Sequence, residues 1–229
     1  MLSGDIQDIL TRSQKSGWVW EPEAKRLLSL AGIKVPKFSW AKTSREAVAA
    51  GESIQYPLVA KIVSPEIIHK SEAGGVTVGI ENEAHLVDVF IRYSRFEGFA
   101  GVLIEEMVSG FELIIGAKID YQFGPVVLLG IGGTAVEVYQ DTTIRMAPLS
   151  TADAQFMVNC LQGSQLLKGY RGAEPVDVAE LAELMTHFSR LVMDLEDRIE
   201  SIDLNPVKCT GDQCIVADAR IMLKAGNSV

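Results

Sequence analysis

Residues 57–76 read PLVAKIVSPEIIHKSEAGGV, and this stretch restricts how the chain can fold. The apolar run 58–63 predicts a strand, the Pro, His, Lys, Ser and Gly residues of 64–75 predict a loop, and 76–80 returns as a strand. Lys61 is flanked by aliphatic residues in the first strand, so it could direct its ammonium group at a phosphate from a rigid base. The alternative is a lysine that faces water on a one-sided sheet.

The loop that follows carries further candidates for phosphate chemistry. Gly74 and Gly75 allow backbone N–H groups to converge on an anion, and we expect both glycines and Lys70 to bind the nucleotide. His69 could accept a phosphoryl group, because neutral imidazole is a competent nucleophile near pH 7. A solvated or structural loop histidine is the simpler interpretation.

The two common glycine-rich nucleotide motifs are missing from the sequence. His69-Lys70-Ser71 is the nearest approach to a Walker A motif, but it lacks both glycines. Gly130-Ile131-Gly132-Gly133 leads into residues 134–138, whose alternation is typical of a strand rather than of the helix that a Rossmann motif requires. A nucleotide would therefore have to bind by a sheet-based route.

A second candidate stretch is acidic and turns at Gly110: residues 105–112 read EEMVSGFE. Glu105 and Glu112 could bracket an adenosine, one binding the exocyclic amine and the other the ribose hydroxyls. We expect nucleotide contacts from Glu105, Glu106, Met107, Val108 and Glu112. The alternative is the solvated edge of a hairpin.

A third candidate is Asp203-Leu204-Asn205-Pro206, followed by Asp218. Residues 203 and 205 share one face if they form a strand, and Asp218 would lie on the neighbouring strand after a short turn. Carboxylate and amide oxygens suit Mg²⁺, which takes few protein ligands and leaves room for phosphate oxygens. An Asn-Pro turn is the competing interpretation.

The segment from Gly130 to Arg145 also carries Glu137 and Asp141. Arg145 could stabilise a transferring phosphoryl group. A glycine-containing hairpin, with a strand over 135–139 and another over 143–146, explains the segment nearly as well.

The pattern along the whole chain predicts an α+β fold with antiparallel sheet. Helices alternate with strands, but short turns join several of the strands. The expected helices cover residues 5–15, 22–32, 43 onward, 82–93, 151–161 and 177–195, and the expected strands 37–41, 58–63, 76–80, 102–108, 112–119, 126–131, 199–204 and 214–217.

The bulk composition excludes several classes of function. The formal net charge is -9 without a Lys/Arg run, so nucleic acid is a poor partner. No stretch is apolar enough for a signal peptide or a membrane span, so we expect a cytoplasmic protein without membrane contact. Three cysteines do not make a disulfide framework, and we expect Cys160, Cys209 and Cys214 to be small buried or half-buried hydrophobic residues.

Taken in order, the motifs resemble the ATP-grasp superfamily. More specifically, they resemble the nucleotide-binding beta subunit of ADP-forming acetyl-CoA and related acyl-CoA synthetases, a group similar to succinyl-CoA synthetase. The resemblance covers about residues 22–220, and its most specific motifs are HKSEAGGV (69–76) and DLNP (203–206). The other matching stretches are PLVAKIVSPEII (57–68), VLIEEMVSGFELIIGAKID (102–120), FGPVVLLGIGGTAVEVYQDTTIRMAPL (123–149), LLKGYRG (166–172) and ESIDLNPV (200–207).

The resemblance implies an ATP-grasp fold with ATP or ADP bound between the sheets of two lobes. An N-terminal helical extension (1–21) would precede an N-lobe (22–104) and a C-lobe (105–229). Lys61 would contact phosphate, Glu105 and the backbone near Val108 would hold adenine, and Glu112 would hold the ribose. Asn205 and Asp218 would bind Mg²⁺, with Asp203 beside them.

The implied reaction interconverts acyl-CoA, ADP and phosphate with the free acid, CoA and ATP, through an acyl phosphate and a phosphohistidine. His69 matches a histidine thought to serve as a second relay near the nucleotide. The primary phosphohistidine and the CoA-binding domain have no match in this sequence, so the resemblance implies an alpha-type partner subunit that carries both. Residues 173–175, Ala-Glu-Pro, depart from the family's basic, proline-rich turn, which leaves partner docking in doubt there.

Two other functions fit an ATP-grasp domain. One is a regulatory module that binds nucleotide without turnover, as in fusions to acetyltransferases. The other is a carboxylate ligase that joins an acyl phosphate to an amine, which would leave His69 without a role.

Overall fold

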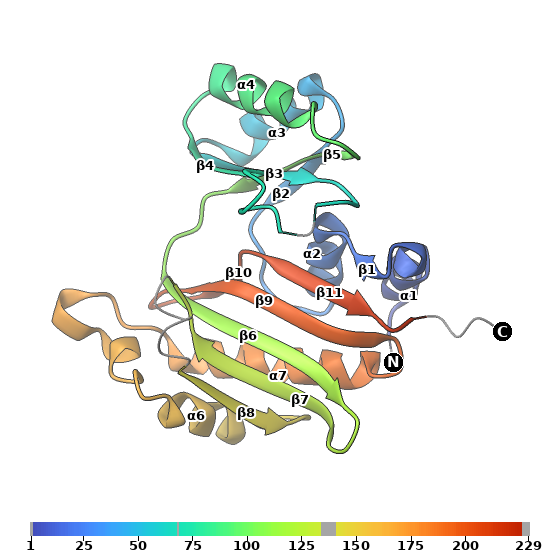
Figure 1. Ribbon diagram of the computed structural model, residues 1–229. Coiled ribbons are helices and arrows are strands. Elements are labelled where there is room, and N and C mark those ends of the chain that lie inside the picture. Colours follow the sequence, from blue (N-terminus) through green and yellow to red (C-terminus); the bar gives the residue numbers. More distant parts are fainter. Residues whose placement is uncertain (1, 68, 134–140, 226–229) are drawn as a thin grey trace. The chain divides into compact units, whose positions relative to one another are not determined.

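The computed structural model describes residues 2–67, 69–133 and 141–225, and Figure 1 traces them. The chain forms two compact units. The larger combines Met1–Val35 with Ser109–Val229, and the smaller is Pro36–Val108.

The smaller unit is a four-stranded antiparallel sheet, in the order β2-β5-β3-β4, with two helices on one face (Figure 1). Side chains of the strands, such as Ala60, Ile62 and Ile104, form its core with Leu86 and Phe90 of the second helix. The elements are β2 (Phe38–Ala41), α3 (Ser44–Ile54), β3 (Leu58–Val63), β4 (Val76–Ile80), α4 (Glu83–Tyr93) and β5 (Gly101–Glu106).

Side-chain caps begin both of these helices. Thr43 accepts a hydrogen bond from the backbone N–H of Glu46, whose carboxylate in turn accepts from the Thr43 N–H, so the two residues form a capping box at the start of α3. The Asn82 side chain accepts from the N–H of His85 at the start of α4.

The larger unit is built on a seven-stranded antiparallel sheet in the order β1-β11-β9-β6-β7-β8, with β10 paired to β9. The long helix α7 lies along one face of this sheet and α6 lies near β8 (Figure 1). The strands are β1 (Trp18–Val19), β6 (Phe111–Asp120), β7 (Gly124–Ile131), β8 (Thr142–Met146), β9 (Ile199–Cys209), β10 (Cys214–Val216) and β11 (Ala219–Leu223). The helices are α1 (Gly4–Ser13), η1 (Gln14–Ser16), α2 (Glu21–Leu30), α6 (Thr151–Cys160), η2 (Leu166–Lys168), η3 (Tyr170–Gly172) and α7 (Val178–Leu195).

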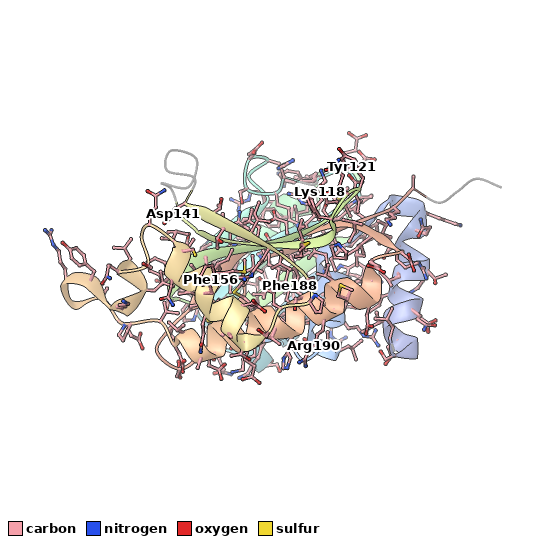
Figure 2. All side chains as sticks on the ribbon, turned by 90° about the horizontal axis from the view of Figure 1, so that it is seen from below. Lys118, Tyr121, Asp141, Phe156, Phe188 and Arg190 are labelled. Atoms are coloured by element: carbon pink, nitrogen blue, oxygen red, sulfur yellow. A yellow bond between two sulfur atoms is a disulfide. The ribbon has the colours of Figure 1, made fainter. Side chains whose placement is uncertain are left out.

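Alternation along β9 gives the sheet one covered face and one open face. Ile202 and Leu204 are buried in the core that includes α7, while Asp203 and Asn205 are exposed on the other side. In Figure 2, Phe156 and Phe188 lie on the side that α6 and α7 cover, and Lys118 lies on the opposite side. The predicted α+β class with antiparallel sheet is confirmed.

The N-terminal segment packs with the C-terminal strands. β1 pairs antiparallel with β11, and residues of α1 and α2, such as Ile9 and Leu27, join the core of the larger unit. The compact units are therefore divided differently from the expected boundaries at residues 22 and 105. The expected strand over 135–139, with Glu137, lies outside the described residues.

The structure answers the question of a turn at Asn205-Pro206. β9 runs through both residues, and β6 supplies only Ile114 opposite them, because Leu113 pairs with Val207 and Ile115 with Leu204. Asn205 and Pro206 therefore form a β-bulge, which tolerates proline inside a sheet. The turn interpretation is wrong for this structure.

The cysteines were expected to be buried or half-buried residues outside any disulfide, and this expectation is wrong for each of them: Cys209 and Cys214 are buried but paired, and Cys160 is exposed. Cys209 and Cys214 form a disulfide between β9 and β10, where they lie directly opposite each other with Cα atoms 4.2 Å apart. A spacing of five residues places them at a matching position of the hairpin. Cys160 is free and exposed.

Among the described residues, no helix is long and apolar enough to cross a membrane.

Candidate functional site

In the smaller unit, Lys61 and Glu105 form a buried ion pair. Lys61 pairs in register with Leu103, and Glu105 with Val59, so the two charged side chains are diagonal neighbours on the sheet face away from the core of α3 and α4. Lys61 Nζ lies 3.1 Å from Glu105 Oε2, and the side chains are 8% and 3% exposed. Lys61 is thus held by a carboxylate rather than extended into water.

In the neighbouring loop, the N–H groups of both glycines form hydrogen bonds to carbonyls of the same loop. The Gly75 N–H donates to the Lys70 carbonyl at 2.7 Å, and the Gly74 N–H donates to the Ser71 carbonyl at 3.2 Å. A Cβ at residue 75 would lie 2.5 Å from Ile62 Cγ2, so only glycine fits there. These N–H groups close the loop in this structure, and their contact with a nucleotide stays a prediction.

His69 is the accessible member of the loop. Its side chain is 62% exposed, and Nδ1 lies 3.9 Å from Glu72 Oε1. Lys70, next to it, is buried. Because the imidazole is exposed, it can be reached from outside the chain, as a phosphoryl acceptor requires.

Residues 106–108 lead out of the smaller unit. The Glu106 carboxylate accepts from the Lys37 N–H at 2.8 Å, and the Glu106 N–H donates to the Lys37 carbonyl at 3.0 Å. Met107, 45% exposed, and half-buried Val108 lie in the irregular segment before β6. Glu106 therefore holds the start of β2, while Met107 presents its side chain to solvent.

In the larger unit, Asp203, Asn205 and Asp218 meet on the open face of the sheet. The Asn205 N–H donates to the Asp218 carbonyl at 3.2 Å. Gly116 lies opposite Asp203 on β6, and Arg220 lies opposite it on β11. With no side chain on Gly116, the sheet is open beside the carboxylate.

The electrostatics of Asp203 indicate a site that favours a cation. Although Asp203 lies on the open face, partial removal of its carboxyl from water raises its pKa above the ordinary value, Arg220 lowers that pKa, and the nearby Asp218 carboxylate raises it. Two carboxylates and an amide oxygen are a donor set that fits Mg²⁺. In the part of the chain that the structure describes, no three His, Cys, Asp or Glu side chains gather as a metal site.

Glu112 lies beside the glycines that follow β7. The Gly132 N–H donates to the Glu112 carbonyl at 2.7 Å, and a Cβ at residue 132 would approach the Glu112 backbone to 2.9 Å. The Glu112 carboxylate accepts a hydrogen bond from Lys208 of β9. Lys208, which sequence analysis missed, gives the proposed ribose ligand a defined position.

Arg145 does not lie with Asp203, Asn205 and Asp218 on the open face of the sheet. It pairs in register with buried Val127, so it lies on the face that α6 and α7 cover. Its Nε lies 3.3 Å from Asp153 Oδ1, and its guanidinium stacks 4.7 Å from the centre of the Phe156 ring. Arg145 thus connects β8 to α6 in this structure.

Asp141 holds the turn that follows α6. Its carboxylate oxygens accept from the N–H groups of Gln162 and Gly163 at 2.8 and 2.7 Å. Its own carbonyl accepts from the Ile131 N–H at 3.1 Å. In Figure 2, Asp141 lies at the opposite end of the sheet from Tyr121.

Comparison with known proteins connects this geometry to a family. A family model described as an ATP-grasp domain matches residues 11–223. The chain is 40% identical over 211 residues to the ADP-forming acetate–CoA ligase I subunit beta of Pyrococcus furiosus, covering 89% of this chain and 90% of that one. It is 41% identical over 222 residues to the ADP-forming 4-hydroxybutyrate–CoA ligase of Nitrosopumilus maritimus, covering 93% of this chain but only 32% of that protein.

Solved structures agree with these sequence matches. The chain is similar to dinucleotide-forming acetyl-coenzyme A synthetase 1 of Ca. Korarchaeum cryptofilum in complex with coenzyme A, Ca-AMPCP and HgCl+, with a TM-score of 0.89 and 38% identity over 95% of this chain and 99% of that chain. A second structure of that enzyme, with coenzyme A and Mg-AMPPCP, gives a TM-score of 0.85 and 37% identity over 96% and 100% of the two chains. The resemblance drawn from the sequence motifs is confirmed.

Proposed function

The chain belongs to the ATP-grasp family, and from that premise we propose that it is the nucleotide-binding beta subunit of an ADP-forming acyl-CoA ligase. The proposed reaction is acyl-CoA + ADP + phosphate ⇌ carboxylic acid + CoA + ATP. ATP or ADP and Mg²⁺ are its cofactors.

The observation that carries this proposal is the nearly full-length match to separate beta subunits. The chain covers 90% and 96% of two such subunits from Pyrococcus furiosus. It spans about a third of the longer ligase from Nitrosopumilus maritimus, at 32%. The whole reaction therefore requires further domains, which we assign to an alpha-type partner that carries the CoA-binding domain and the primary phosphohistidine.

The described residues fit distinct roles in this reaction. Asn205 and Asp218 hold Mg²⁺ with Asp203 beside them, and the bound ion supplies positive charge that neutralises the phosphates. Lys61 contacts phosphate, and Glu105 keeps its ammonium in place. Glu112, positioned by Lys208, binds the ribose hydroxyls, and residues 105–108 contact adenine.

His69 provides the relay. In the direction of ATP formation, an imidazole nitrogen of His69 attacks the phosphorus of the partner's phosphohistidine, so a new N–P bond forms as the old one breaks. A terminal phosphate oxygen of ADP then attacks this phosphorus, and the bond to His69 breaks as ATP forms. The exposure of the side chain, 62%, supports this role.

Reconstitution tests the proposal. The purified chain is mixed with an alpha-type subunit, acetyl-CoA, ADP, phosphate and Mg²⁺, and ATP formation is followed, with each subunit alone as a control. We expect ATP only from the mixture. Nucleotide binding without turnover would instead identify a regulatory module, and turnover with an amine in place of CoA would identify a different carboxylate ligase.

A further inference from the structure

We propose that the buried Lys25–Glu21 pair of α2 positions Asp218 for metal binding. This inference rests on the proposed function, because it concerns the Mg²⁺ site on the open face of the larger unit. It assigns a role to two charged residues that lie outside the candidate site.

Lys25 connects α2 directly to the segment before β11. Its Nζ donates to the Ala217 carbonyl at 2.7 Å and lies 3.6 Å from Glu21 Oε1, one helical turn earlier. Both side chains are 0% exposed. Removing two charges from water costs several kcal/mol per ion before their attraction is counted, so a buried pair is weak evidence of a role in stability alone.

The segment that Lys25 holds is also fixed by β9. The Ala217 N–H donates to the Pro206 carbonyl at 3.0 Å, and the Asn205 N–H donates to the Asp218 carbonyl at 3.2 Å. These two bonds tie the segment to the β-bulge that carries Asn205. Lys25 adds a third attachment, from the helix side.

These attachments fix the separation of the two proposed metal ligands. Asn205 lies on β9 and Asp218 just before β11, so their distance depends on how the 217–218 segment lies against the bulge. Mutation of residues that orient metal ligands typically weakens metal affinity or activity by about 10- to 100-fold. An ammonium suits this position because it can bind a carbonyl and a carboxylate at once.

The test compares Mn²⁺ affinity among variants of the full chain, by electron paramagnetic resonance with saturating ADP. The double variant Glu21→Gln/Lys25→Met removes both charges, so that neither is left buried and unpaired. We expect its Mn²⁺ dissociation constant to rise about 10- to 100-fold, while ADP affinity without metal is unchanged. Lys25→Arg keeps a cationic donor, and we expect it to retain most of the Mn²⁺ affinity.

A matched control comes from another ion pair of the same unit. Lys34 Nζ lies 2.7 Å from Glu180 Oε2 and both side chains are partly exposed, so Lys34→Met/Glu180→Gln should leave the Mn²⁺ affinity unchanged. Asp218→Ala tests the metal site itself: unchanged Mn²⁺ affinity in that variant would refute the proposed site and not only its positioning.

Two results would overturn the positioning role. One is loss of Mn²⁺ affinity in Asp218→Ala together with wild-type affinity in a folded Glu21→Gln/Lys25→Met protein. The other is failure of both the double variant and Lys25→Gln to fold, as judged by circular dichroism, because the pair would then be required for the fold as a whole. Weakened Mn²⁺ binding in a folded Lys25→Gln protein would support the role even if the double variant does not fold.

Discussion

At the residue scale, the buried pair of Lys61 and Glu105 makes the smaller unit sensitive to a single substitution. Lys61→Met leaves the Glu105 carboxylate buried without the ammonium that lies 3.1 Å away. We expect a loss of about 3–5 kcal/mol in the free energy of unfolding, measured by urea denaturation. Adding Glu105→Gln should restore part of that loss, because it removes the buried negative charge that Lys61 neutralised.

The control for this substitution is Lys42→Met in the same unit. Lys42 lies 4.7 Å from the Trp40 ring centre on the surface, and removing it should cost less than about 1 kcal/mol. If Lys61→Met were no more destabilising than Lys42→Met, the assignment of a structural partner to Glu105 would fail.

Local sequence patterns predicted several candidate site residues but few of their partners. Lys61, Asp203, Asn205 and Asp218 were predicted from local patterns, and the contact between the last two is observed. The partners Lys208 of Glu112 and Arg220 of Asp203 depend on strand register, which a single sequence does not give. The face that Arg145 occupies also depends on register, because one position along β8 decides on which side of the sheet a side chain lies, and its role in stabilising a phosphoryl group stays a prediction.

At the element scale, Gly110 determines how the chain enters β6. Its φ of 145° lies in a region that favours glycine, and a Cβ would lie 2.7 Å from the Cys209 carbonyl oxygen. We expect Gly110→Ala to lower stability by about 1–3 kcal/mol in thermal or urea unfolding.

Gly116→Ala is the control from the same strand. There the nearest atoms to a new Cβ are the Ile202 carbonyl oxygen at 3.6 Å and Leu128 Cβ at 3.9 Å, so alanine fits. We expect a change in stability below about 1 kcal/mol. Equal losses in the two variants would contradict the argument from backbone geometry.

The start of α6 predicts a pH dependence. The Ser150 hydroxyl donates to the Asp153 carboxylate, as does the Ser150 N–H, and both lower the pKa of Asp153, with Arg145 lowering it further. Because the folded pKa lies below the unfolded value of about 3.9, this stabilisation is complete above that value and is lost as the pH falls through the folded pKa.

Asp153→Asn should therefore lower the midpoint of thermal unfolding at pH 7, and its difference from wild type should shrink as the pH falls below about 3.9. Asp8→Asn, at an exposed position of α1, controls for replacing a helical aspartate in the same unit. If the difference in unfolding midpoint between Asp153→Asn and wild type were as large at pH 3 as at pH 7, ionisation of this carboxylate would not be the source of the stabilisation.

Most elements followed from sequence patterns, and the exceptions have identifiable causes. Apolar runs and alternating patterns predicted the strands of both sheets apart from β1 and β11. β1 has only two residues, and β11 is a short strand between β1 and β9 whose pairing with β1 joins opposite ends of the chain. The Asn-Pro pair of β9 was ambiguous because a bulge and a turn favour the same residues.

At the scale of the whole molecule, distant contacts decide how the chain divides. Lys25 reaches Ala217 and β1 pairs with β11, so the first 35 residues belong with the C-terminal strands. No local pattern could indicate this, because the contacts join opposite ends of the sequence. The order of the motifs, in contrast, was sufficient to predict the family that the comparisons confirm.

The proposed relay passes the phosphoryl group through His69, so it requires this histidine specifically. The smaller unit offers a matched control in His85, an exposed histidine in the first turn of α4. With the alpha-type partner present, His69→Ala should bind Mg-ADP normally but lose ATP formation by at least about 100-fold, a magnitude typical of losing a group that takes part in the chemistry. His85→Ala should remain active.

The most direct measurement is transfer of label from γ-labelled ATP to the purified chain in the presence of Mg²⁺ and the alpha-type partner, with the site of any acid-labile, base-stable phosphate mapped by mass spectrometry. We predict label on His69 of this chain, absent from His69→Ala and present in His85→Ala. A fully active mixture in which His69 never carries label, or in which His69→Ala is as active as wild type, would contradict the relay.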